Sequence, residues 1–268
     1  MRRRTILKAA FAGIGLSSSP AFAQTDPLSE IFAQLQEDPT LVENAWTGSR
    51  RQNDPDRATG TGARSTRAIS ARSREMIVMF EVSSRKIYEA KYTRPIWPAG
   101  KSGVTIGIGY DLRFASEEYL NRDWAHLLST DMIATLIPVL QLGGKEAKEA
   151  LPTLQGVVVP WHAAEEQFGA FLPYPTAVVE SVFKNTHKLS DDSLGALVSL
   201  VYNRGADMPE GSTRRREMRE IRALMERERF SEIPAKFREM KRLWPGPKER
   251  GLILRREAEA RLFELGLN

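Results

Sequence analysis

Apolar residues recur at helical spacing through most of the chain, and polar or glycine-rich breaks separate the segments. The clearest segment covers residues 190–205, where a serine cap precedes the pattern and a glycine ends it. Its apolar residues stand at positions i, i+3, i+4 and i+7: Leu194, Leu197, Val198 and Val201. This spacing predicts a buried central helix.

The same spacing predicts a helix near the front, over residues 74–90. Ile77, Phe80 and Ile87 fall on one side of it, and Glu81 lies at the edge of this apolar stripe. Further helical segments are expected over residues 28–35, 116–140, 160–172 and 213–265, the last giving about three surface helices with a break at 244–247.

Residues 102–111 form a glycine-punctuated apolar ribbon of a different kind. Val104, Ile106 and Ile108 alternate with Thr105 and glycines, which predicts a half-buried hairpin. Its glycines allow a chain-like ligand to approach the backbone closely, with Glu81 facing the same cleft. We therefore expect a mainly α fold, of α+β type, with one small hairpin near the front and no internal repeat.

The first 23 residues have the pattern of a signal peptide. Arg3, Arg4 and Lys8 precede an apolar run over 9–16, and Ala21-Phe22-Ala23 supplies small residues for cleavage. The paired arginines and the mildly apolar run favour twin-arginine export, with an ordinary Sec signal as the alternative. The run is too short to span a bilayer, which takes about 20 residues. We therefore expect a periplasmic or secreted protein without stable membrane insertion.

Residues 24–73 are interpreted as an N-terminal extension that ends in a basic linker, and residues 74–268 as the folded domain. From residue 48 to 73 the chain is rich in arginine and small polar residues and has almost no large apolar ones. Such a segment is either attracted to an anionic surface such as a cell wall or is a solvated tether.

Composition excludes some kinds of function. The net charge is +5, but the leader holds four of these charges and no acid, which leaves about +1 and no argument for nucleic-acid binding. The chain has no cysteine, so neither disulfides nor thiolate ligands are available. His162 and Glu165 share helical spacing, but a third ligand is missing, so a solvated helix face is favoured. No metal and no cofactor are expected.

Glu81 is the leading candidate for chemistry, because apolar neighbours such as Phe80 and Val82 suit a carboxyl group that acts as a general acid. Composition alone would make it an ordinary exposed helix glutamate. Three blocks change this view: Glu81 followed by Tyr88 and by Thr105-Ile106-Gly107-Ile108-Gly109, then residues 197–205, then residues 251–259 with their paired arginines. In this order they resemble the phage-type lysozymes, family 24 of the glycoside hydrolases, over residues 74–265.

The resemblance implies a small lobe with a β-hairpin and a larger helical lobe flanking a cleft. It implies hydrolysis of the β-1,4 bond between N-acetylmuramic acid and N-acetylglucosamine in peptidoglycan, the expected partner of a monomeric enzyme. Glu81 would protonate the glycosidic oxygen, and Thr105 would help to place the attacking water. Tyr88, Tyr110 and Asn203 are the expected substrate-binding residues.

The chain departs from the family pattern at the second carboxylate. Family members usually carry an aspartate two residues after the tyrosine, and Ala90 stands there. Asp111 is the first substitute, because it lies six residues after Thr105 and shares its face of the ribbon; an aspartate that caps the next turn is an equal alternative. Glu89 is the second. The third possibility is that Glu81 acts alone, with a substrate group as nucleophile, as in lytic transglycosylases.

Two other readings of the chain stay open. The missing aspartate would suit a non-catalytic peptidoglycan-binding module, and the charged C-terminal helices would suit an interaction protein. Three smaller hypotheses concern arginines and aromatic residues. Arg255 and Arg256 would reach Glu81 and bias its charge. Residues 214–216 would pair with nearby glutamates along a helix, and Trp97 with Tyr92 would form either a sugar platform or part of the core.

Overall fold

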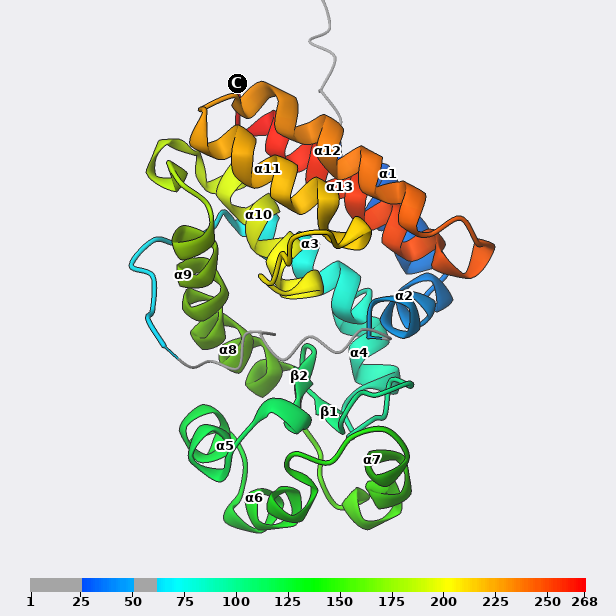
Figure 1. The fold of residues 1–268 in the computed structure, drawn as a ribbon. Helices are drawn as coiled ribbons and strands as arrows, with labels where there is room; N and C mark the ends of the chain where they lie inside the picture. The colour runs from blue at the N-terminus through cyan, green and yellow to red at the C-terminus, as the bar shows by residue number, and fades with distance from the viewer. Residues whose placement is uncertain (1–25, 51–61) are drawn as a thin grey trace, which may run out of the picture.

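The computed structural model describes residues 26–50 and 62–268, and this part of the chain is mainly helical with one two-stranded antiparallel sheet (Figure 1). The fold class expected from the sequence pattern is thus confirmed. The expected signal peptide and residues 51–61 of the expected linker lie outside the described residues. The helices and strands are α1 (Ser29–Glu37), α2 (Thr40–Arg50), α3 (Ala71–Val82), α4 (Arg85–Lys91), β1 (Thr105–Ile106), β2 (Tyr110–Asp111), α5 (Glu117–Trp124), α6 (Thr130–Leu136), α7 (Gly144–Ala150), α8 (Trp161–Phe171), α9 (Pro173–Val182), α10 (Asp191–Arg204), α11 (Arg216–Glu226), α12 (Ile233–Glu239) and α13 (Arg250–Leu265).

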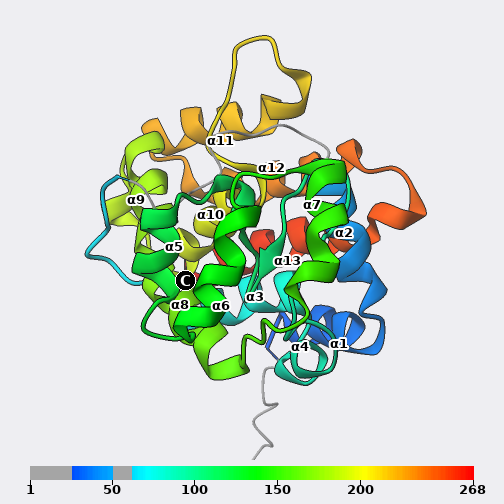
Figure 2. The same cartoon turned by 90° about the horizontal axis from the view of Figure 1, so that it is seen from below.

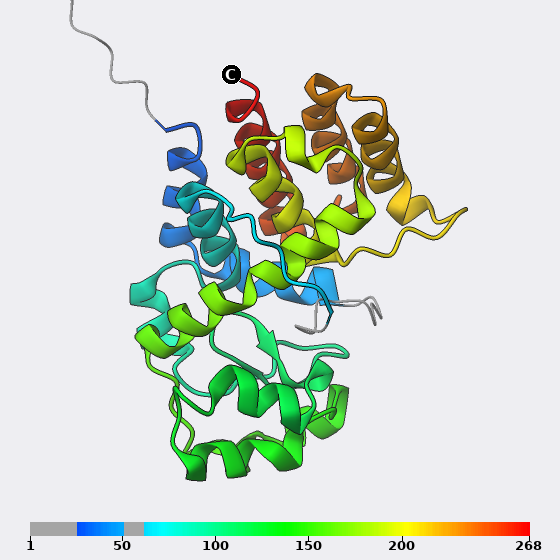
Figure 3. The same cartoon turned by 90° about the vertical axis from the view of Figure 1, so that its left-hand side faces the viewer.

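The elements form two lobes of unequal size. Figure 1 shows the hairpin with α5, α6 and α7 below and the helices α10 to α13 above, and Figure 3 shows the same division from the side. Seen from below, α5, α6 and α7 lie in front of the larger lobe (Figure 2). None of the described helices is both long and apolar enough to cross a membrane.

The central helix α10 forms as its pattern predicts. Ser190 caps it by accepting a hydrogen bond from the Ser193 N–H, and Gly205 ends it with a positive φ of 73°. Its four patterned apolar residues are at most 1% exposed, and the helix packs against α3, α9 and α13. The larger lobe is therefore built around α10.

The front helix differs from the expected single helix over 74–90. It divides into α3 and α4 because Ser83 adopts a positive φ of 63°, which ends α3, and Ser84 then caps α4 by accepting from the Ile87 N–H. Glu81 consequently lies in the last turn of α3, next to the break. This position brings its side chain toward the hairpin.

The hairpin is shorter and more buried than its alternation predicts. Thr105 pairs with Asp111 and Ile106 with Tyr110, and residues on both faces of β1 are buried. The reason is that the ribbon has neighbours on both sides. A Cβ at Gly107 would lie 2.7 Å from Trp124, and a Cβ at Gly109 would lie 2.9 Å from the Glu81 Oε2 atom. The glycines therefore let the turn approach Trp124 and Glu81.

Two further helices, α13 and α2, lie deeper than expected. The prediction that all C-terminal helices are on the surface is wrong for α13, whose Arg255, Arg256 and Glu259 are at most 2% exposed because they pair with one another in the interior. In the N-terminal extension, α1 and α2 both pack on the body. The Leu41 carbonyl of α2 lies so close to Gly251 of α13 that an added Cβ would be 2.0 Å away from it.

Candidate functional site

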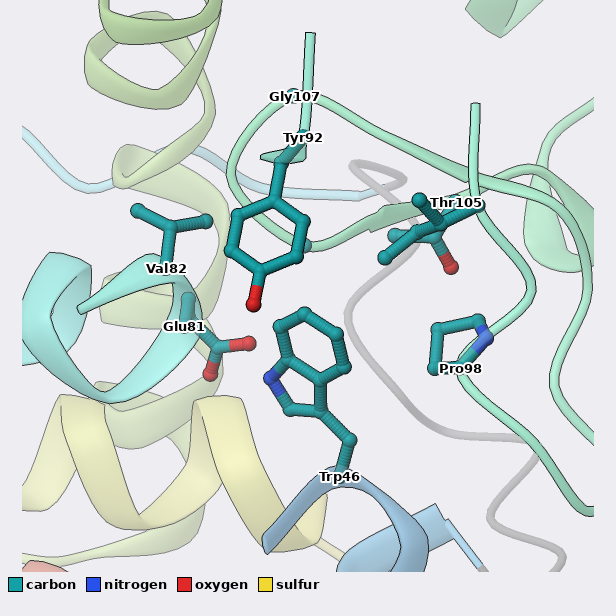
Figure 4. Close-up of a pocket in the computed structure, with 9 residues that line it drawn as sticks. Trp46, Glu81, Val82, Tyr92, Pro98, Thr105 and Gly107 are labelled. Carbon is teal, nitrogen blue, oxygen red and sulfur yellow. The ribbon is translucent and has the colours of Figure 1, made fainter. Parts of the chain in front are cut away.

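A pocket of about 260 Å³, including the open space at its mouth, lies between the end of α3, the hairpin and α2 (Figure 4). Its lining includes the side chains of Glu81, Thr105, Tyr92 and Trp46 and the turn glycines Gly107 and Gly109. Three distant parts of the chain thus meet at one place. Among the described residues that line this pocket, Glu81 alone is acidic.

The carboxylate of Glu81 is nearly removed from solvent, with 2% of the residue exposed. Its Oε1 atom accepts a hydrogen bond of 2.8 Å from Nη1 of Arg255, whose side chain is 3% exposed. The Arg255 guanidinium also lies 5.6 Å from the centre of the Phe80 ring. Because an isolated buried carboxylate is costly, this pairing explains how Glu81 stays inside. The hypothesis that a C-terminal arginine reaches Glu81 is confirmed for Arg255.

A second layer of buried polar groups fixes Arg255 in turn. Ser199 of α10 accepts from Arg255 through its carbonyl oxygen at 3.2 Å and through its Oγ at 3.3 Å. Glu259 lies 3.5 Å from the Arg255 Nε and accepts a 2.8 Å hydrogen bond from Arg256. Burial raises the pKa of Glu259, although the two arginines oppose this, and burial lowers the pKa of Arg256 to about 10. Two carboxyl groups, of Glu81 and Glu259, and two guanidinium groups, of Arg255 and Arg256, thus form one buried network.

Thr105 lies in the same pocket wall as Glu81 and is 3% exposed. Asp111 stands directly opposite it in the strand pair, so the two side chains share one face of the hairpin. Asp111 does not line the pocket, however. Its Oδ1 accepts from the backbone N–H of Gly103 at 3.1 Å and of Arg113 at 3.0 Å, which caps the short 3₁₀ turn after β2. Asp111 therefore both shares a hairpin face with Thr105 and caps the following turn, the two positions that the sequence offered as alternatives.

Tyr88 and Tyr110 point elsewhere. Tyr88 is fully buried and donates to the Val159 carbonyl at 2.9 Å, and burial raises the pKa of its hydroxyl. Tyr110 donates to Asp123 at 3.0 Å. Neither residue lines the pocket.

Asn203, the third expected substrate contact, is half-buried and accepts from Arg256 at 3.2 Å. Glu89 pairs with Arg85 on the exposed side of α4, with 47% of its side chain exposed. The structure therefore brings together Glu81 and Thr105 but leaves Asn203 and Glu89 outside the pocket wall.

The weaker motifs take ordinary positions. His162 and Glu165 are exposed on α8, and the described residues contain no group of three side chains suited to a metal ion. Arg216 pairs with Glu220 at 3.7 Å along the helix surface, as expected, whereas Glu217, which lies 2.9 Å from Arg216, is fully buried. Trp97 donates from its indole to the Ser102 carbonyl and does not line the pocket.

Sequence reasoning missed the contribution of α2. Trp46 lines the pocket and meets the Tyr92 ring edge-on, with centroids 5.2 Å apart, while Tyr92 donates to Glu43 at 2.9 Å. Burial, with the Glu43 carboxylate adding, raises the pKa of Tyr92, so its hydroxyl stays a donor. A signal was present, since Leu41 with Ala45 and Val42 with Trp46 form two i, i+4 apolar pairs.

No family model matches this chain, and a search of curated proteins finds no match either. The case for a function therefore rests on the geometry of the pocket and on its residues.

Proposed function

We propose that this chain is an exported N-acetylmuramidase that cleaves the glycan strands of peptidoglycan, with Glu81 as the general acid. One observation carries the proposal: a carboxylate 2% exposed lies with Thr105 in one pocket between a helix end and a glycine-rich turn. A general acid needs such a water-poor position from which to protonate a leaving group. The hairpin glycines allow the turn to approach this acid closely.

In the proposed reaction, Glu81 acts in its protonated form and gives its proton to the oxygen of the β-1,4 bond as that bond breaks. Thr105 orients a water molecule that attacks the anomeric carbon. Asp111 is the proposed second carboxylate, which accepts the proton of this water, because the strand register places it on the Thr105 face. The products are a reducing N-acetylmuramic acid end and a free hydroxyl on N-acetylglucosamine. No cofactor takes part in this scheme.

The lytic transglycosylase route is the second candidate, and one contact favours it. The Asp111 Oδ1 already accepts two backbone N–H groups, so Asp111 has a structural task that would leave Glu81 to act alone. In that route the 6-hydroxyl of N-acetylmuramic acid displaces the leaving group and forms an anhydro ring without water. The two routes differ by one water molecule in the product mass.

Incubation of the purified mature protein with peptidoglycan tests the proposal. We expect new reducing ends from the wild type, a loss of at least about 10²-fold for Glu81→Gln, and little change for Glu89→Gln, the matched control on the exposed side of α4. Detection of anhydro-muramic acid products by mass spectrometry would show that the reaction is transglycosylation and not hydrolysis. Undiminished release by Glu81→Gln, or binding of peptidoglycan without any turnover, would contradict catalysis by Glu81.

A further inference from the structure

Helix α2 places a large aromatic side chain inside the Glu81 pocket. Trp46 is 9% exposed and lines the same wall as Glu81 and Thr105. In Figure 4 its indole lies between these two residues, below the Tyr92 ring. The resemblance to the phage-type lysozymes begins only near residue 74, so α2 lies outside the segment that suggested the activity.

The remaining space is small for the proposed substrate. The pocket reaches about 260 Å³ only when the open space at its mouth is counted, and the enclosed part of it is far smaller. Glu81 itself is 2% exposed. A sugar ring that touches both Glu81 and Thr105 would need the volume that the flat indole now fills.

The contacts made by the first turn of α2 differ in how deeply they are buried. Its first turn is firmly docked, because the Leu41 carbonyl abuts Gly251 and Val42 is fully buried. In the same turn, Glu43 accepts from Tyr92 at 2.9 Å and from Lys91 at 3.0 Å, but the Glu43 and Lys91 side chains are 38% and 46% exposed. Exposed ion pairs contribute little stability, so the Glu43–Lys91 pair adds little to the contacts that hold Trp46 in the pocket, which are mainly its own packing against Tyr92.

We propose that the indole of Trp46 occupies the subsite of the N-acetylhexosamine ring next to Glu81, and that the site opens when this side chain leaves. The proposal rests on the proposed function, since it names the sugar site of that same acid. It makes α2 an autoinhibitory element that substrate must displace. The affinity for substrate is then reduced in proportion to the fraction of molecules that are open.

A labelling experiment without any sugar tests the closed state. The probes are a water-soluble carbodiimide and glycinamide, which convert an accessible carboxyl group to an amide, with the modified residue identified by peptide mass spectrometry. We expect labelling of Glu81 to be slow in the wild type and several-fold faster in Trp46→Ala. Glu43→Gln, which weakens the contacts with Lys91 and Tyr92, should give a smaller increase. Glu37→Gln, at an exposed position of α1, is the control and should match the wild type.

A binding experiment tests the sugar subsite. Tetra-N-acetylchitotetraose is titrated by calorimetry into Glu81→Gln and into Glu81→Gln/Trp46→Ala, so that turnover does not interfere. We expect the double variant to bind about tenfold more tightly, as it would if about one molecule in ten were open before the change. Thermal unfolding of each variant establishes that it is folded.

The outcomes separate the two proposals. Unchanged or weaker sugar binding together with unchanged Glu81 labelling would overturn the proposal that Trp46 blocks the subsite. Trp46 would then be a fixed part of the pocket wall or a sugar contact, and catalysis by Glu81 would be unaffected. Faster labelling of Glu81 in Trp46→Ala, but no release of reducing ends by any variant, would support the closed pocket and overturn the muramidase function.

Discussion

Arg255 and Glu81 lie 174 residues apart in the chain and meet across 2.8 Å, with both side chains at most 3% exposed. Removal of one partner from a buried ion pair leaves an uncompensated charge and typically costs about 3–5 kcal/mol. We expect Arg255→Met to lower the free energy of unfolding by this amount. Arg255→Met/Glu81→Gln should recover part of the loss, because the charge left behind is then removed. Urea denaturation measures both.

The matched control for this pair is Arg250→Met, on the same helix. Arg250 donates to Gln34 at an exposed position, so its loss should change stability by less than about 0.5 kcal/mol. An Arg255→Met variant as stable as Arg250→Met would show that the buried pair does not hold Glu81 in place.

Asp111 can be tested for capping and for catalysis separately. Asp111→Asn keeps an oxygen that accepts from Gly103 and Arg113, whereas Asp111→Ala removes it and should cost about 1 kcal/mol of stability. Both changes remove the carboxylate, so both should reduce turnover by about 10²-fold if Asp111 activates water. Full turnover by a stable Asp111→Asn enzyme would restrict Asp111 to the capping role.

Tyr88 should matter for stability and not for substrate binding. Its hydroxyl is buried and donates to the Val159 carbonyl, so Tyr88→Phe leaves that acceptor without its donor and should cost about 1–2 kcal/mol. We expect KM for peptidoglycan fragments to stay unchanged. A raised KM with unchanged stability would instead support the substrate-binding role implied by the family resemblance.

Gly251 controls how α2 docks on α13. A Cβ at this position would lie 2.0 Å from the Leu41 carbonyl, so Gly251→Ala must push the two helices apart, at a cost of about 1–3 kcal/mol. Limited proteolysis should then cut within the N-terminal helices sooner. Gly156→Ala is the control, because nothing lies within 4 Å of its added Cβ. Equal protease resistance of the two variants would contradict close docking of α2.

Glu257 should make stability depend on acid pH. Burial alone would raise its pKa, but hydrogen bonds from Lys241 and Arg238 outweigh this and lower the pKa from 4.5 to about 2. Because the pKa is lower in the folded state, the stabilisation is complete above about pH 4.5 and is lost as the pH falls toward 2.

The effect of Glu257 should be about 1–2 kcal/mol once solvent screening at this partly exposed side chain is allowed for. Denaturation midpoints of Glu257→Gln should fall less steeply than those of the wild type between pH 4.5 and 2. Identical slopes would show that the pairs with Lys241 and Arg238 add nothing.

The sequence pattern predicts those helices and strands whose caps and apolar faces are formed by residues close together in the chain. The central helix α10 has both its serine cap and its terminal glycine in sequence, and the ribbon carries its own turn glycines. The break at Ser83 was missed because apolar spacing continues across it. The burial of α13 was missed because charged residues normally indicate a surface, and only pairing with residues far along the chain reverses this.

The candidate site divides in the same way. Glu81 and Thr105 stand within 24 residues of each other and could be joined by pattern. Trp46 could not be assigned to the site in this way. The apolar pattern around it predicts a helix, but it does not predict that this helix docks at Gly251 and places the indole beside Glu81.

The long stretch of chain between Glu81 and Arg255 affects the order in which contacts form during folding. During synthesis the acid and the hairpin emerge long before α13, and until α13 docks the Glu81 carboxyl has no guanidinium to accompany it into the interior. Contacts between residues so far apart form late, because the intervening chain must first be ordered. The nascent small lobe can therefore adopt its backbone early, but the acid acquires its final surroundings only when the two ends of the domain assemble as one cooperative unit.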